Sequence, residues 1–408
     1  MGYILGAMRL LFVADGRSPI ALNWIQYFIE QGHEVHLAST FPCSPGLRLA
    51  SLHIVDVAFS GVIASKHTVD QATRDNRQPK KELWRVTTPR IRMALRHWMG
   101  PFTLGRAVRC LHQVLNYIQP DLVHAMRIPY EGMISALSDP KAPLLVSIWG
   151  NDFTLHAPAT PMMSRFTRLA LKRASALHTD CHSDVKRAFA WGFPANRLAV
   201  VLPGAGGVQR EIFYPESDAS AHTPQTSPVI INPRGLRAYV RNDSFFRSIP
   251  LVLEHQPKAR FVCPGMEGDP QAHRWVTDLG IAAQVELLPQ QSRLQMAALF
   301  RQALVAVSPS SHDGTPNTLL EAMACGCFPV AGDLESLREW ITPGVNGLLV
   351  DPSNPSILAS ALQLALEHPE LRARAGKHNT RLITEWAEYH TVMKRAEDYY
   401  RRVLSYSM

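Results

Sequence analysis

Short apolar runs alternate with longer stretches of helical periodicity along most of the chain. In the first half, the runs that read as buried strands are residues 10–14, 35–38, 120–125, 143–148, 176–179 and 198–202. Helical segments lie between them, beginning with residues 23–29 after a turn at 15–18. Because strands separated by helices build parallel sheets that are covered on both faces, the pattern predicts an α/β fold.

The alternation breaks once and then restarts. Residues 214–228 are polar and rich in Pro, Ser and Thr, which predicts a linker. Apolar runs recur at 229–232, 260–263, 285–288, 305–307, 328–331 and 347–350. A chain of 408 residues is long enough for two cores, so we predict Rossmann-like domains at 1–213 and 229–386. Ligands of such sheets bind at the carboxyl ends of the strands, here in a cleft between the domains.

The segment 308–330 carries the clearest chemical pattern. It reads as a strand end, a polar loop with Asp313, a short helix with Glu321 about one turn inside, and a second strand. Thr315 is expected to cap the helix, Pro316 to occupy its first position and Gly326 to end it. The free N–H groups at the helix start favour a diphosphate, and the two acids accept hydrogen bonds from sugar hydroxyls. The segment therefore suits a nucleotide sugar.

At these residues the chain resembles the retaining glycosyltransferases of the GT-B fold, specifically the GT4-type family. The shared pattern is an acid, seven residues, Glu321, then Ala322-Met323-Ala324, Gly326 and Pro329-Val330. The family carries Glu at the first acid, whereas this chain has Asp313, which is one methylene shorter. The resemblance implies that Glu321 binds the ribose and Asp313 the donor sugar. The rest of the predicted donor-binding segment is Gly314, Thr315, Pro316, Asn317, Thr318 and Leu319.

The resemblance also implies roles for residues elsewhere. Arg234 and Arg241 are expected to grip the donor diphosphate, with Arg237 as a competitor for the second position, since guanidinium forks bind phosphate oxygens bidentately. Gly16, in the turn after the first strand, is predicted to approach the donor. The backbone of Leu288 is expected to meet the nucleotide base.

The segment Trp149-Gly150-Asn151-Asp152 ends another first-domain strand. Trp149 stands where many relatives have His, so a general base is not expected there, and a core role is favoured for the indole. Asp152 is the first-domain candidate for a polar contact near the reacting centre. Three histidines, His124, His156 and His182, read as structural and without ligand-like partners. The pair Asp333 and Glu335 is not expected to bind a metal.

The function implied by the resemblance is transfer of a sugar, with retention and without a metal, from a nucleoside diphosphate-sugar to a hydroxyl of a glycan or lipid-linked acceptor. In such transferases the leaving phosphate takes the acceptor proton and the protein positions the reactants. The residues predicted to act at the reacting centre are Arg234, Arg241, Asp313 and Asp152. The last helix, 387–408, is expected to cross back onto the first domain. A non-catalytic sugar-nucleotide-binding partner, a phosphorylase and an epimerase remain alternatives.

The net charge of +8 is concentrated in one segment. Residues 64–110 hold eleven Lys or Arg and three Asp or Glu, and Leu95, Trp98, Met99 and Phe102 alternate with the bases. Such a segment favours an anionic membrane surface or an anionic glycan, and a solvated basic face is the open alternative. Nucleic acid is disfavoured because no stacking platform or known motif is present.

Hydropathy, the first residues and the cysteines together predict the cellular compartment. No apolar run reaches the ~18 residues that span a bilayer, and residues 1–8 lack the basic start of a signal peptide. Six scattered cysteines without a ligand pattern predict reduced thiols. We therefore expect a cytoplasmic protein that contacts the inner face of the membrane peripherally and needs no cofactor beyond its nucleotide-sugar substrate.

Overall fold

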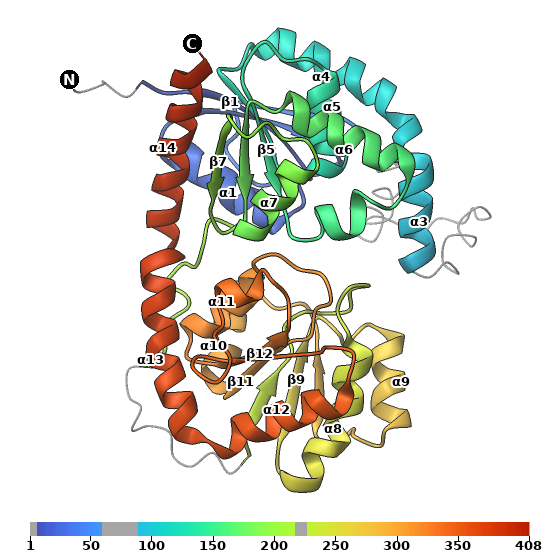
Figure 1. Ribbon diagram of the computed structural model, residues 1–408, viewed down its shortest axis with the longest axis vertical. Helices are drawn as coiled ribbons and strands as arrows, with labels where there is room; N and C mark the ends of the chain where they lie inside the picture. Colours follow the sequence, from blue (N-terminus) through green and yellow to red (C-terminus); the bar gives the residue numbers. More distant parts are fainter. Residues whose placement is uncertain (1–5, 59–88, 217–226, 408) are drawn as a thin grey trace, which may run out of the picture. The chain divides into compact units, whose positions relative to one another are not determined.

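The computed structural model describes residues 6–58, 89–216 and 227–407 (Figure 1). The chain divides into two compact units, one formed by Met1–Gly206 with Met393–Met408 and the other by Gly207–Val392. Each unit holds one parallel sheet with helices packed against it, so the predicted α/β architecture is confirmed. Of the segment predicted as a linker, 217–226 lies outside the described residues.

The sheet of the first unit has seven parallel strands in the order β3-β2-β1-β4-β5-β6-β7. Every apolar run predicted as a strand in this half forms one. The edge strand β3 was not predicted, because its side chains alternate between half-buried and exposed and form no apolar run. The strands are β1 (Arg9–Ala14), β2 (Glu34–Ser39), β3 (Ser51–Ile54), β4 (Leu122–Ala125), β5 (Leu144–Ile148), β6 (Ala176–Thr179) and β7 (Leu198–Val201).

Helices connect these strands and cover the sheet. Ser18 accepts a hydrogen bond from the N–H of Ala21 and so caps the first helix, which starts at Pro19. All residues of β4, β5 and β6 are buried, as expected for strands covered on both faces. The helices are α1 (Pro19–Glu30), α3 (Pro89–Met99), η1 (Gly100–Thr103), α4 (Leu104–Ile118), η2 (Ile128–Gly132), α5 (Met133–Leu137), η3 (Asp152–His156), α6 (Pro161–Arg173) and α7 (His182–Ala190).

A chain of buried polar side chains crosses the middle of this sheet. His124 on β4 bonds the hydroxyl of Tyr400 through Nδ1 and that of Ser147 through Nε2, at 2.5 and 2.7 Å. Ser147 continues to His178, whose Nε2 reaches the carbonyl oxygen of Leu202 at 2.9 Å. The structural role predicted for His124 thus has a specific form: it joins the C-terminal helix to the sheet.

The sheet of the second unit has six parallel strands in the order β10-β9-β8-β11-β12-β13, and each corresponds to a predicted run. Successive residues of one strand face different cores: Ile230 packs with α8 and α12, whereas Ile231 packs with α10 and α11. Helices therefore cover both faces of this sheet as well. The strands are β8 (Val229–Ile231), β9 (Arg260–Pro264), β10 (Val285–Leu288), β11 (Val305–Ser308), β12 (Phe328–Gly332) and β13 (Leu348–Val350).

The chain ends in three consecutive helices. The last of them begins in the second unit, and its residues from Met393 onward belong to the first. The helices of this half are α8 (Asn242–His255), α9 (Pro270–Asp278), α10 (Arg293–Gln302), α11 (Asn317–Ala324), η4 (Leu337–Glu339), α12 (Pro355–Glu367), α13 (Pro369–Trp386) and α14 (Tyr389–Ser407).

Candidate functional site

Three predicted residues meet at the carboxyl edge of the second sheet. Arg234 follows β8, Asp313 follows β11, and Thr318 lies in the first turn of α11. The guanidinium of Arg234 donates to a carboxylate oxygen of Asp313 at 2.5 Å and to the hydroxyl of Thr318 at 3.3 Å. Arg234 and Asp313, 79 positions apart in sequence, thus form a largely buried ion pair, with side chains 10% and 15% exposed.

The start of α11 differs from the prediction by one residue. Pro316 stands at the N-cap and Asn317 is the first helical residue, so neither Pro316 at the first helical position nor Thr315 as the cap is correct. The hydroxyl of Thr315 instead accepts a hydrogen bond from the indole of Trp340 at 3.0 Å, because Thr315 is buried in the loop. The end of the helix is as predicted, since Gly326 has φ of +91° just past it.

Several polar atoms at this edge are buried without a hydrogen-bond partner in the part of the chain that the structure describes. They include Nε of Arg234, Oδ1 of Asn317 and the hydroxyls of Ser308 and Ser310. The first N–H groups of a helix also have no intrahelical acceptor, and those of Asn317 and Thr318 begin α11. Because buried polar groups are normally satisfied, the unpaired donors and acceptors indicate a polar ligand.

Glu321 lies on α11 next to an arginine that the sequence did not single out. Its carboxylate oxygen is 3.9 Å from the guanidinium of Arg293, and the Glu321 side chain is 16% exposed. Burial raises the pKa of Glu321 to about 7, and Arg293 partly opposes the shift. Arg293 also donates to Gln209 at 2.8 Å and lies 5.5 Å from the ring centroid of Phe213. Arg293 is the first residue of α10 and follows the capping residue Ser292. In the sequence this pattern signals the start of a helix, and nothing in it points to a ligand-binding role for Arg293.

Two other predicted donor residues have their polar groups engaged within the protein. Arg241 donates two hydrogen bonds to the carboxylate of Asp243, at 2.9 and 2.8 Å, and these bonds raise its pKa. The carbonyl oxygen of Leu288 accepts from the N–H groups of Met266 and Glu267. A contact between Leu288 and a base would therefore have to use other atoms of that residue.

The acid pair in the loop after β12 is held by an arginine. Arg338 donates two hydrogen bonds of 2.7 Å to the carboxylate of Asp333 and thereby lowers the pKa of that group. Glu335, the other acid of the pair, is not among the described groups of three or more side chains close enough to share an ion. The prediction that this pair binds no metal stays a prediction.

In the first unit, Gly16 occupies a position with no room for a side chain. A Cβ there would lie 2.4 Å from Sγ of Cys43 and 2.9 Å from Oγ of Ser39. The N–H of Gly16 donates to the same Ser39 hydroxyl at 3.0 Å. The glycine thus has a packing reason within the unit, independent of any contact with the donor.

Asp152 is buried and acts on other protein groups. It is 1% exposed, and one of its oxygens accepts from Nε and Nη2 of Arg127 at 3.0 and 2.6 Å. Its other oxygen accepts from the N–H of Trp149 at 3.2 Å. The predicted direct contact with a ligand does not fit this burial; Asp152 instead orients Arg127, which the sequence analysis did not single out.

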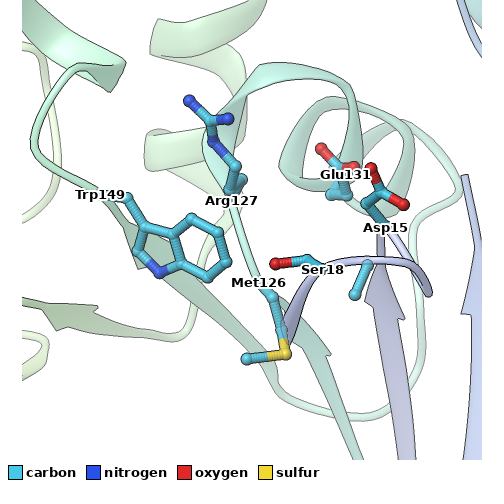
Figure 2. Close-up of a pocket in the computed structure, with 7 residues that line it drawn as sticks. Asp15, Ser18, Met126, Arg127, Glu131 and Trp149 are labelled. Atoms are coloured by element: carbon cyan, nitrogen blue, oxygen red, sulfur yellow. The ribbon is translucent and has the colours of Figure 1, made fainter. Parts of the chain in front are cut away.

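Arg127 and Trp149 line a small hollow at the carboxyl ends of β1, β4 and β5 (Figure 2). The hollow measures about 20 Å³, and its other lining residues are Ala14, Asp15, Ser18, Met126 and Glu131. Glu131 is buried, accepts a hydrogen bond from Thr40 at 2.7 Å, and has a pKa raised by burial. Trp149 thus faces the hollow and is not enclosed in the core, contrary to the expected role.

The prediction that His156 has no ligand-like partner is wrong. His156, expected to lack a ligand-like partner, forms a hydrogen bond of 2.8 Å with His97 between ring nitrogens. Burial, followed by the charge of Arg127, lowers the pKa of His156 to about 2, so the ring is neutral. The pair therefore links α3 to η3 without a charge.

Of the basic segment predicted to contact a membrane, residues 64–88 lie outside the described residues. The remainder forms α3, η1 and the first part of α4. Searched over the described ranges, no helix combines the length and apolar character needed to cross a bilayer.

Two parallel sheets of the Rossmann type are the architecture of the GT-B glycosyltransferases, and the Arg234–Asp313 pair and Glu321 lie at the carboxyl edge of the second sheet. Residues 16–204 match the Glycosyl transferase 4-like domain, and residues 214–381 match Glycosyl transferases group 1. The two matches together cover most of the chain, which therefore belongs to the group 1, GT4-type glycosyltransferase family.

Among curated relatives, the chain is similar to D-inositol 3-phosphate glycosyltransferases of several bacterial species. It is 28% identical over 206 residues to that of Thermobispora bispora, covering 46% of this chain and 47% of the relative. It is 31% identical over 200 residues to that of Xylanimonas cellulosilytica, covering 45% and 46%. The matched region thus spans about half the length of these relatives.

Solved structures match over nearly the whole chain. Sucrose-phosphate synthase from Thermosynechococcus elongatus superimposes with a TM-score of 0.71 at 16% identity, covering 97% of this chain and 99% of that one. Anabaena HepE in complex with UDP-glucose gives a TM-score of 0.69 at 15% identity, covering 97% and 100%. At these identities the likeness shows the shared GT-B fold.

Proposed function

We propose that the protein transfers a sugar, with retention and without a metal ion, from a nucleoside diphosphate-sugar to a hydroxyl of a glycan or lipid-linked acceptor. The observation that carries the proposal is the set of buried polar atoms without partners at the carboxyl edge of the second sheet, above all Nε of Arg234 and Oδ1 of Asn317. A ligand rich in oxygen atoms and hydroxyl groups supplies the missing partners.

The chemistry of each group supports a division of labour. Nε of Arg234 and the first N–H groups of α11 are donors, so they suit the oxygens of a diphosphate. The carboxylates of Asp313 and Glu321 are acceptors, which suit the hydroxyls of the donor sugar and the ribose. Since Asp313 already pairs with Arg234, the acid fixes the guanidinium in place before the donor arrives.

The reaction that fits these groups needs no protein nucleophile. The acceptor hydroxyl attacks the anomeric carbon from the face that the diphosphate leaves, the new glycosidic bond forms as the sugar–phosphate bond breaks, and a phosphate oxygen takes the proton. Arg234 and the helix start stabilise the negative charge that develops on the diphosphate. This positive charge is the support for proposing that no metal takes part.

Similar solved structures and curated relatives suggest which donor and acceptor to test first. A structure with the same fold binds UDP-glucose, so a UDP-sugar is our first choice of donor. The curated relatives are named for D-inositol 3-phosphate, so a phosphate-bearing polyol joins glycans and lipid-linked hydroxyls in the first acceptor assays. Cytoplasmic action at the inner face of a membrane belongs to the same proposal.

The test is a panel of UDP-, GDP-, ADP- and TDP-sugars, scored by thermal stabilisation and donor turnover, with and without EDTA. We expect stabilisation by one nucleotide class, unaffected by EDTA and lost in Glu321→Ala and in Arg234→Ala. Glu385→Ala and Arg381→Ala are the matched controls, because that pair lies exposed on α13. NMR of the product reports the anomeric configuration, and inversion would refute retention. Stabilisation without any turnover would support the non-catalytic alternative.

A further inference from the structure

Within the described part of the basic segment, α3 and η1 expose a row of large apolar side chains. Leu95, Trp98, Met99 and Phe102 on α3 and η1 are 41%, 62%, 46% and 70% exposed. Their spacing of three, four and seven positions places them on one helix face. We call these four residues the apolar stripe. A helix of a globular protein normally turns such a stripe toward the core, whereas here it faces outward.

The opposite face holds the segment in place. His97 and Leu104 are buried, and the ring of His97 bonds that of His156 at 2.8 Å. The hydroxyl of Tyr130 donates to the carbonyl oxygen of Arg96 at 2.6 Å. Because these contacts fix the inner face, the outward direction of the apolar stripe is a feature of the packed structure.

The stretch of sequence that contains the apolar stripe carries charge of one sign. Residues 89–120 contain no Asp or Glu and five arginines, Arg90, Arg92, Arg96, Arg106 and Arg109. Arg106 and Arg109, both exposed, follow the stripe in sequence and lie on α4. A second copy docking through the same face would bring arginine against arginine, which is unfavourable. A partner with charge complementary to these arginines is an anionic surface.

We propose that the apolar stripe, with Arg106 and Arg109, docks the protein on the surface of an anionic lipid bilayer. Trp98 and Phe102 insert at the headgroup boundary, where aromatic side chains are favoured, and the arginines contact lipid phosphates. The segment lies in the interface, in keeping with the lack of a bilayer-crossing helix among the described residues. This docking names the surface for the membrane contact proposed above, and it does not depend on the transfer reaction.

The experiment is co-sedimentation of the full chain with vesicles of phosphatidylcholine alone or mixed with phosphatidylglycerol. We expect binding to the mixed vesicles that weakens in 0.5 M salt. Each arginine near the surface contributes a factor of about five. The double variant Arg106→Ala/Arg109→Ala should therefore bind the mixed vesicles roughly 25-fold more weakly.

The double variant Trp98→Ser/Phe102→Ser tests the apolar contribution. It should lower vesicle partitioning at least about ten-fold, since two large exposed side chains no longer leave water. The matched control is Leu294→Ser, a 69% exposed apolar residue on α10 of the second unit, which should bind vesicles like the wild type. Unchanged thermal unfolding midpoints verify folding, and unchanged donor stabilisation separates docking from the proposed transfer.

Three outcomes would overturn the proposal. The first is equal binding to neutral and anionic vesicles. The second is wild-type binding by the Trp98→Ser/Phe102→Ser variant. The third is a dimer in light scattering that this variant dissociates, in a protein that does not bind vesicles, because the apolar stripe would then be an interface between copies of the chain.

Discussion

Replacing Glu321 by Gln should stabilise the second unit, and the gain should grow with pH. Burial holds the pKa of Glu321 at about 7, whereas a Glu in an unfolded chain titrates near 4.5. Between these values the unfolded state releases the proton and the folded state keeps it. A raised carboxyl pKa therefore costs stability that is absent below about pH 4.5 and complete above about pH 7. Gln carries no charge at any pH and avoids the cost.

The size of the effect follows from the shift. A displacement from 4.5 to about 7, at 1.36 kcal/mol per unit, corresponds to about 3 kcal/mol. For a unit of this size, about 2–4 °C of midpoint per kcal/mol gives an increase of roughly 6–12 °C. The gain should be small at pH 4.5 and full at pH 8.5. The attraction of Arg293 is already contained in the shift, since it lowers the pKa.

The assay is differential scanning calorimetry of the full chain and the Glu321→Gln variant from pH 4.5 to 8.5. The difference between the two midpoints removes every pH effect that they share. Glu286→Gln serves as control for the removal of a carboxylate at the surface, because Glu286 lies in an exposed pair with Arg260. Arg293→Ala should move the titration to higher pH, because the guanidinium that favours the carboxylate is gone.

A midpoint difference between Glu321→Gln and wild type that stays constant across this range would refute the reasoning, since it would mean that Glu321 titrates alike in both states. A midpoint difference that shrinks as pH rises would mean that folding lowers the pKa of Glu321 instead of raising it. The same substitution should weaken donor binding under the proposed function, so a variant that is more stable and less able to bind donor is the full expectation.

Two further substitutions test the packing of the first unit. Gly16→Ala should lower the free energy of unfolding by about 1–3 kcal/mol, because the new Cβ meets Sγ of Cys43 at 2.4 Å; adding Cys43→Ala should recover part of the loss in urea unfolding. Tyr400→Phe should cost about 1–3 kcal/mol by leaving buried His124 without its hydroxyl partner, whereas Tyr406→Phe, at an exposed tyrosine, should change the denaturation midpoint little. A Tyr400→Phe variant as stable as wild type would contradict the role assigned to the buried polar chain.

Much of the fold could be read from local patterns. Every apolar run predicted as a strand is one, because burial on both faces of a parallel sheet demands continuous apolar residues. Strand β3 was not predicted because an edge strand such as Ser51–Ile54 buries too few side chains to require a continuous apolar run. The end of α11 was also predictable, since the left-handed backbone at Gly326 follows from a single residue type.

Contacts between distant residues could not be read in this way. The pairing of Arg234 with Asp313 spans 79 positions, and the Glu321 carboxylate meets Arg293 from another helix. Asp152 was expected near a ligand, but it is buried under Arg127 because the loops after β4 and β5 pack together. Thr315 was expected to cap a helix, but its hydroxyl accepts a hydrogen bond from the indole N–H of Trp340 instead.

The sequence by itself therefore determined the two sheets, the order of their strands along the chain and the acid-bearing segment around Asp313 and Glu321. These depend on hydrophobic periodicity and backbone preference, which neighbouring residues carry. Tertiary structure alone decided which charges are paired, which polar atoms are left for a ligand, and that Trp98 and Phe102 face outward. Those outcomes depend on desolvation and on the approach of segments far apart in the chain, and no local pattern encodes them.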